Sequence, residues 1–160
     1  MIIAVMGVTG SGKSTVGRLL ARQLHWQFYE GDDFHPPANV EKMKRGVPLD
    51  DRDRRPWLKA IRESLRAAVD RGENAVIACS ALKVSYRRML QIRGKVIFVY
   101  LKASVPLIQR RLKKRTGHFM NPDLIQSQFD TLEEPKDAFQ VDAGLTPGKI
   151  VRRIRNELSV

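Results

Sequence analysis

The most constraining feature of the sequence is a glycine-rich segment at 7–14, GVTGSGKS, which fits the pattern GxxxxGK[ST]. It follows the apolar run 2–6, which is typical of a strand buried on both faces, and it opens the segment 13–24, whose apolar residues have helical spacing. A glycine loop between a strand and a helix surrounds phosphates with backbone N–H groups and a helix N-terminus. The segment is therefore predicted to bind a nucleoside triphosphate, and its context disfavours the alternative of a glycine-rich turn with an accidental lysine.

The residue types of this loop predict separate roles. Lys13 is expected to reach the β- and γ-phosphates, and the Ser14 hydroxyl is expected to bind Mg²⁺, a hard cation that prefers oxygen ligands. The predicted nucleotide-binding residues of the loop are Gly7, Thr9, Gly10, Ser11, Gly12, Lys13, Ser14 and Thr15.

The rest of the chain alternates between predicted strands and helices. Further strands are expected at 27–30, 74–79, 95–101 and 138–142, and helices at 40–45, 56–71, 85–92, 105–115, 122–132 and 147–158. Pro56, Pro122 and Pro147 are expected near helix starts, and Gly72 just after a helix end. The alternation predicts a three-layer α/β fold, in which helices flank a parallel sheet.

Length and composition predict one soluble domain over residues 1–160. A chain of 160 residues with 42% hydrophobic residues can bury a sizeable core without disulfides, and the lone Cys79 lies in a predicted buried strand, where an inert thiol in a reducing cytoplasm is expected. The apolar N-terminus has no basic region and is too short to span a bilayer, so neither a signal peptide nor a membrane anchor is expected.

The net charge of +12 favours anionic partners. The basic residues are spread along the chain, and no aromatic–basic strand motif or recognition helix accompanies them, which disfavours nucleic acid as the partner. No GTPase base-reading motif or long coupling insertion is present either, so a compact kinase of a small metabolite is the better hypothesis.

An acidic segment at 30–36, EGDDFHP, follows the second predicted strand. Ligands of open α/β sheets bind at the carboxyl ends of the strands, so this segment is the candidate acceptor site. Asp32 is a candidate to orient a substrate hydroxyl and take its proton, although a helix cap or a solvated carboxylate is the alternative. His35 is either a substrate ligand or a structural loop residue.

Three longer motifs carry a family resemblance. The run 28–58, with GDDFHPPANVEKMKRGVPLDDRDRRPWL, the run CSALKVSYR at 79–87, and GHFMNPDLIQSQFDTLEEP at 117–135 closely resemble the bacterial-type gluconokinases. The resemblance implies that ATP and D-gluconate give ADP and 6-phosphogluconate on a nucleoside-monophosphate-kinase-like fold with a mobile lid. It also implies a homodimer.

The resemblance also suggests substrate ligands. It implies that Asp32 faces the acceptor hydroxyl, and that three cations, Arg54, Lys83 and Arg87, hold the substrate carboxylate or the transferred phosphate. A guanidinium fork suits a carboxylate, although each cation is alternatively a surface charge. Ser80 is either a donor to a substrate hydroxyl or a helix cap. One departure is Glu30, where the family commonly has Asp, which puts a metal role for this residue in doubt.

A basic segment at 110–119, RRLKKRTGHF, ends one predicted helix and predicts a short lid at about 115–123. Closure over ATP would exclude water and bring Arg111 or Arg115 to the phosphates, although the helix dipole alone also favours a basic helix end. His118 is a candidate substrate ligand. The adenine is expected between this helix and residues 142–146.

Two other functions compete with this hypothesis. A different acceptor, such as shikimate, another aldonate or adenylyl sulfate, is disfavoured by the GDDFHP and CSALK motifs. A catalytically inactive paralogue is disfavoured because Lys13, Ser14 and Asp32 are all present.

Three aromatic residues beside apolar neighbours are interpreted as core or pocket wall: Trp26, Trp57 and Phe98.

Overall fold

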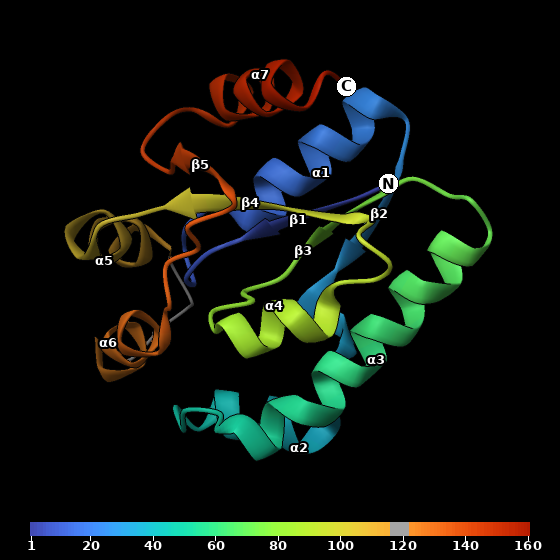
Figure 1. Cartoon of the computed structure of the whole chain (residues 1–160). Helices are drawn as coiled ribbons and strands as arrows, with labels where there is room; N and C mark the ends of the chain where they lie inside the picture. Colours follow the sequence, from blue (N-terminus) through green and yellow to red (C-terminus); the bar gives the residue numbers. More distant parts are fainter. Residues whose placement is uncertain (116–121) are drawn as a thin grey trace.

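The computed structural model describes residues 1–115 and 122–160. At its centre lies a five-stranded parallel sheet in the order β2-β3-β1-β4-β5 (Figure 1). The central strand β1 pairs on both sides, with Ile2 opposite Ala75 of β3 and Val96 of β4. This arrangement confirms the predicted parallel α/β fold. The strands are β1 Ile2–Met6, β2 Gln27–Glu30, β3 Ala75–Ala78, β4 Val96–Lys102 and β5 Phe139–Asp142.

Helices cover both faces of the sheet (Figure 1). Successive residues of β1 alternate between two cores, because side chains of a strand point to opposite faces: Ile2, Ala4 and Met6 pack with α3 and α4, whereas Ile3 and Val5 pack with α1 and α7. The helices are α1 Lys13–Leu24, α2 Pro37–Lys44, α3 Asp51–Asp70, α4 Val84–Leu90, α5 Val105–Lys114, α6 Pro122–Thr131 and α7 Pro147–Leu158.

The third cluster of buried side chains lies on α5, α6 and the loops beside the carboxyl ends of the strands. It joins Val8 of the glycine loop to Ile108 and Leu112 of α5 and Ile125 of α6. The segments on either side of residues 116–121 are thereby fixed against the glycine loop. Within the described residues, no helix combines the length and the hydropathy that a bilayer crossing requires.

Two helix starts differ from the prediction by more than one residue. Helix α3 begins at Asp51 rather than at Pro56, because Asp50 and Asp53 form a capping box that satisfies the first backbone N–H groups, and Pro56 therefore lies inside the helix. Helix α2 begins at Pro37, three residues before the predicted start. Pro147 and Pro122 do start helices, as predicted, and Gly72 follows the end of α3 with a positive φ of 71°.

The short 3-10 helix η1, Gly31–Phe34, was not predicted from the sequence, and it depends on a close backbone approach. A Cβ on Gly31 would lie 2.4 Å from the carbonyl oxygen of Ala78 and 3.2 Å from Cys79 Cα. The Gly31 carbonyl in turn accepts a buried hydrogen bond of 2.7 Å from Trp57 Nε1. Glycine is therefore required where β2 passes into η1.

We predict that Gly31→Ala lowers the free energy of unfolding by about 1–3 kcal/mol, the usual cost of overpacking a close contact. The matched control is Gly148→Ala in the first turn of α7, where a Cβ meets nothing within 4 Å. That change is expected to be neutral or stabilising by up to about 1 kcal/mol. Urea unfolding measures both, and equal stabilities of the two variants would contradict the prediction.

Candidate active site

The glycine loop has the curled backbone that phosphate binding requires. Gly10 and Gly12 have φ values of 74° and 99°, in the left-handed region that favours glycine. Arg111 of α5 holds the outside of the loop, since its Nη1 donates to the carbonyl oxygens of Gly10 at 3.2 Å and Ser11 at 3.1 Å. The predicted Arg111 thus contacts the loop through backbone carbonyls.

Lys13 lies at the junction between the loop and the acceptor side. Its Nζ donates to the Val8 carbonyl at 2.9 Å, and an ammonium has three N–H donors, so this bond is compatible with further bonds to phosphate oxygens. Burial lowers the pKa of Lys13, while the carboxylates of Asp32 and Glu30 oppose that shift and the charge of Arg115 adds to it. The loop cation therefore lies within electrostatic reach of both acidic residues and of Arg115, the first residue of the predicted lid.

A cavity of about 180 Å³ opens beside Lys13, and we call it the acceptor cavity because Asp32 and His35 of the candidate acceptor segment line it. It brings together six of the predicted site residues, from the glycine loop, η1, α3 and the segment after β3: Thr9, Lys13, Asp32, His35, Arg54 and Ser80. The remaining wall is mostly apolar and comes from α2, the segment before α3, α3 itself and α6: Met43, Val47, Pro48, Leu49, Trp57, Leu124, Ser127 and Gln128.

Asp32 and His35 project from η1 and its end. The Asp32 side chain is 79% exposed, and its Oδ1 lies 3.9 Å from Nε2 of His35, whose side chain is 5% exposed. The imidazole stacks on the Trp57 indole with ring centroids 4.4 Å apart and an interplanar angle of 11°. Burial lowers the pKa of His35, Arg54 adds to this shift, and Asp32 opposes it. Trp57 is both core and pocket wall, as predicted.

The buried Arg54 belongs to a charged network at the start of α3. Its Nη1 donates to the hydroxyl oxygen of Tyr86 at 3.2 Å, and that hydroxyl donates to Asp51. The predicted Lys83 binds the same Asp51 carboxylate, with Nζ 2.9 Å from Oδ1. The hydrogen bond from Tyr86 is the largest cause of a lowered pKa of Asp51, and the hydrogen bond from Lys83 is the next largest. The network orients the Arg54 guanidinium at the cavity wall.

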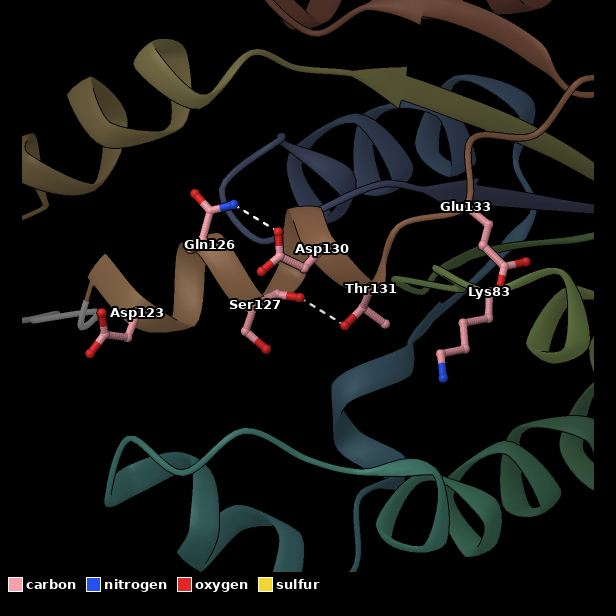
Figure 2. A pocket seen from close by; sticks show the side chains of 7 residues that line it. All are labelled: Lys83, Asp123, Gln126, Ser127, Asp130, Thr131 and Glu133. Atoms are coloured by element: carbon pink, nitrogen blue, oxygen red, sulfur yellow. Dashed lines mark hydrogen bonds between the residues drawn. The ribbon is translucent and has the colours of Figure 1, made fainter.

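Lys83 lines a neighbouring hollow of about 450 Å³ rather than the acceptor cavity (Figure 2). The walls of this hollow come mainly from α6 and carry polar and acidic side chains: Asp123, Gln126, Ser127, Asp130, Thr131 and Glu133. Gln126 Nε2 donates to Asp130 at 2.8 Å across this face of α6 (Figure 2). Because Ser127 lines both hollows, they adjoin at α6.

Arg87 is placed differently from the prediction that it holds substrate. Its Nη1 donates to the carbonyl oxygens of Ala81 at 2.9 Å and Leu82 at 3.0 Å, and its Nη2 to that of Glu133 at 2.9 Å. The guanidinium thereby ties the segment after β3 to the segment after α6. The predicted substrate contact finds no support in this arrangement, because these donors are used by backbone carbonyls outside the acceptor cavity.

Other predicted residues lie at the edges of the described structure. Arg115 follows the last residue of α5, and the predicted lid at about 115–123 falls mostly on residues 116–121. His118 is among them and lies outside the described residues. Cys79 is buried, and burial raises its pKa to about 12, which disfavours the reactive thiolate.

Sequence reasoning missed two residues that shape the cavity. Gln128 Oε1 accepts a hydrogen bond of 3.2 Å from the backbone N–H of Thr9, which links α6 to the glycine loop. Asn39, buried on α2, contacts His35. Both lie inside the motifs that carry the family resemblance, but neither residue type identifies a role without the neighbouring atoms.

Comparisons with known proteins show which families this chain resembles. The family model for shikimate kinase matches residues 9–155. Over 138 residues the chain is 51% identical to the gluconokinase of Gluconobacter oxydans, covering 84% of this chain and 76% of that protein. It is 45% identical to the thermoresistant gluconokinase of Escherichia coli, over 84% and 77% of the two chains.

Solved structures place the fold in the same group. A gluconokinase from Sinorhizobium meliloti superposes with a TM-score of 0.87 at 43% identity, covering 98% of this chain and 94% of that one. A shikimate kinase from Aquifex aeolicus has a TM-score of 0.65 at 18% identity, a likeness of fold alone. The chain therefore belongs to the gluconokinases, within the P-loop kinases that the shikimate kinase family model describes.

Proposed function

We propose that this protein transfers the γ-phosphoryl group of ATP to the primary hydroxyl of D-gluconate, giving ADP and 6-phosphogluconate. One observation carries the proposal: a single cavity joins the loop cation Lys13 to Asp32, His35 and Arg54 on the acceptor side. Carboxylate, imidazole and guanidinium groups suit the hydroxyls and carboxylate of a sugar acid. The identities of 42–51% to gluconokinases support the choice of acceptor.

The chemistry follows from where the charges lie. The loop N–H groups and Lys13 bind the phosphates, and Arg111 and Arg115 add positive charge near the oxygens that gain charge during transfer. The acceptor oxygen forms a bond to γ-phosphorus while the bond from the β–γ bridging oxygen breaks. Asp32 takes the hydroxyl proton, and the buried Arg54 holds the gluconate carboxylate, with Ser80 beside it.

Mg²⁺ fits the donor set as a metal carried with the nucleotide. Within the described residues, no group of three or more His, Cys, Asp or Glu side chains suits a metal ion, so a dedicated protein cage is absent there. P-loop enzymes bind Mg²⁺ through phosphate oxygens and few protein ligands, and Ser14 supplies the hydroxyl expected of the loop. The ion would neutralise phosphate charge. Glu30 is paired with Arg18 at 3.2 Å, so we assign it no metal role.

The match to the shikimate kinase model makes shikimate the second candidate acceptor. Solved shikimate kinases are 18% identical to this chain, far below the gluconokinases, and the polar cluster around Arg54 and His35 lies in the gluconokinase-like run 28–58. We therefore rank D-gluconate first. The proposal also includes a homodimer and a cytoplasmic location. It further includes a lid at about 115–123 that carries His118, and an adenine site near 142–146.

We predict that ADP release with Mg-ATP is stimulated strongly by D-gluconate, and not by shikimate, other aldonates, nucleoside monophosphates or a blank. A coupled assay on the purified protein measures the release. Stimulation by another acceptor would keep the kinase activity and overturn the gluconate assignment, and no stimulation by any acceptor would overturn both.

Asp32→Asn is expected to lower kcat by about 10²–10⁴-fold, the usual contribution of a positioned acid–base group. The matched control is Asp33→Asn, which removes an exposed carboxylate from the same short helix and should leave kcat within about twofold. Steady-state kinetics measures both, and near-normal turnover of Asp32→Asn would remove Asp32 from the proton-transfer role.

Arg54→Lys keeps the charge but removes the planar fork, so the KM for gluconate should rise about 10–100-fold while the KM for ATP changes little. Arg55→Lys, the same change on the exposed neighbour in α3, serves as the control. Equal effects of both variants on the two KM values would show that Arg54 does not bind the carboxylate.

A further inference from the structure

Asn39 is a buried polar residue, 2% exposed, whose side chain contacts two groups at once. Its Nδ2 donates to the backbone carbonyl of Asp53 at 2.8 Å and lies 3.2 Å from Nδ1 of His35. The carbonyl of Asp53 only accepts hydrogen bonds, so the nitrogen end of the amide must face it. The same nitrogen therefore faces His35.

This contact determines which ring nitrogen of His35 carries the proton. An amide NH₂ group only donates, so Nδ1 of His35 must offer a lone pair to Asn39. A neutral imidazole with a lone pair on Nδ1 carries its hydrogen on Nε2. In the opposite tautomer, the Nδ1–H group of His35 would face an N–H group of the Asn39 amide in a buried position.

The Nε2–H group is directed towards the acceptor side. Nε2 lies 3.9 Å from Oδ1 of Asp32, beyond a direct hydrogen bond, and the ring is held flat on Trp57. Trp57 is itself fixed by its bond to the Gly31 carbonyl. Burial disfavours the imidazolium cation. Of the charged groups that act on the ring, Asp32 favours the cation and Arg54 disfavours it.

We propose that Asn39 is a positioning residue that holds His35 as the Nε2–H tautomer, so that His35 donates a hydrogen bond to an acceptor-molecule oxygen beside Asp32. His35 then cannot act as the proton acceptor in the ground state, because the nitrogen that faces the cavity already carries a hydrogen. The identity of that molecule rests on the proposed function, whereas the tautomer does not.

The first test is direct and needs no activity. Nitrogen-15 NMR of the ligand-free protein, labelled at its three histidines, distinguishes protonated from unprotonated ring nitrogens, and His35→Gln assigns the signals. We expect a neutral His35 at pH 7 with hydrogen on Nε2. A hydrogen on Nδ1, or a doubly protonated ring, would overturn the proposal even if gluconate is the substrate.

The second test uses two replacements of His35 that differ in reach. A glutamine can place its amide nitrogen near the position of Nε2, whereas an asparagine reaches only to about Nδ1. His35→Gln should keep the KM for gluconate within about tenfold, and His35→Asn should raise it about 10–100-fold, as expected for a lost buried hydrogen bond. Equal KM values for the two variants would contradict a donor at Nε2.

The third test reverses the hydrogen bond. In Asn39→Asp the new carboxylate accepts from Nδ1–H and raises the pKa of His35, so Nε2 keeps a hydrogen only while the ring is a cation. The KM for gluconate should therefore increase with pH through the neutral range, by about tenfold or more, whereas in the wild type it should not. Asn156→Asp on the exposed face of α7 is the matched control, and identical pH profiles of Asn39→Asp and wild type would overturn the proposal.

Discussion

The acceptor side of the site depends on one buried hydrogen bond, from the Trp57 indole to the Gly31 carbonyl. The bond joins α3, which lies over one face of the sheet, to the 3-10 helix that leaves β2. Gly31 fits there only because it lacks a Cβ, and the indole then provides the surface on which His35 stacks. The positions of Asp32 and His35 relative to the glycine loop therefore follow from core packing.

The strand order supplies the second half of the site. Because β1 and β3 are adjacent and parallel, the glycine loop after β1 and Ser80 after β3 leave the sheet at the same edge, beside η1 after β2. Lys13 then lies near Asp32 and Glu30, whose charges offset part of the cost of its burial. Phosphates bound at the loop would add negative charge beside Lys13 and Arg111, whose side chains both contact loop carbonyls.

The sequence predicted the periodic elements and the glycine loop well, because both rest on local patterns. The strand, loop and helix at the N-terminus were confirmed. Asp32, His35 and Arg54, which were predicted as substrate ligands, line one cavity, and their roles stay predictions. Individual side-chain contacts were not predictable. The bond from Arg87 to the distant Glu133 carbonyl, and the bond from Asn39 to the Asp53 carbonyl that turns its amide nitrogen towards His35, depend on which atoms the fold brings near. The start of α3 was missed because a capping box outweighed the signal of Pro56.

In the proposed reaction, the cavity beside Lys13 presents the primary hydroxyl of a sugar acid to the γ-phosphate. Proton-coupled phosphorus-31 NMR of the product made from ATP and D-gluconate tests it most directly, because the splitting reports which carbon carries the phosphoester. We expect a phosphomonoester signal split by the two protons of a CH₂ group. A signal split by the single proton of a CH group, or inorganic phosphate as the only new product besides ADP, would contradict it.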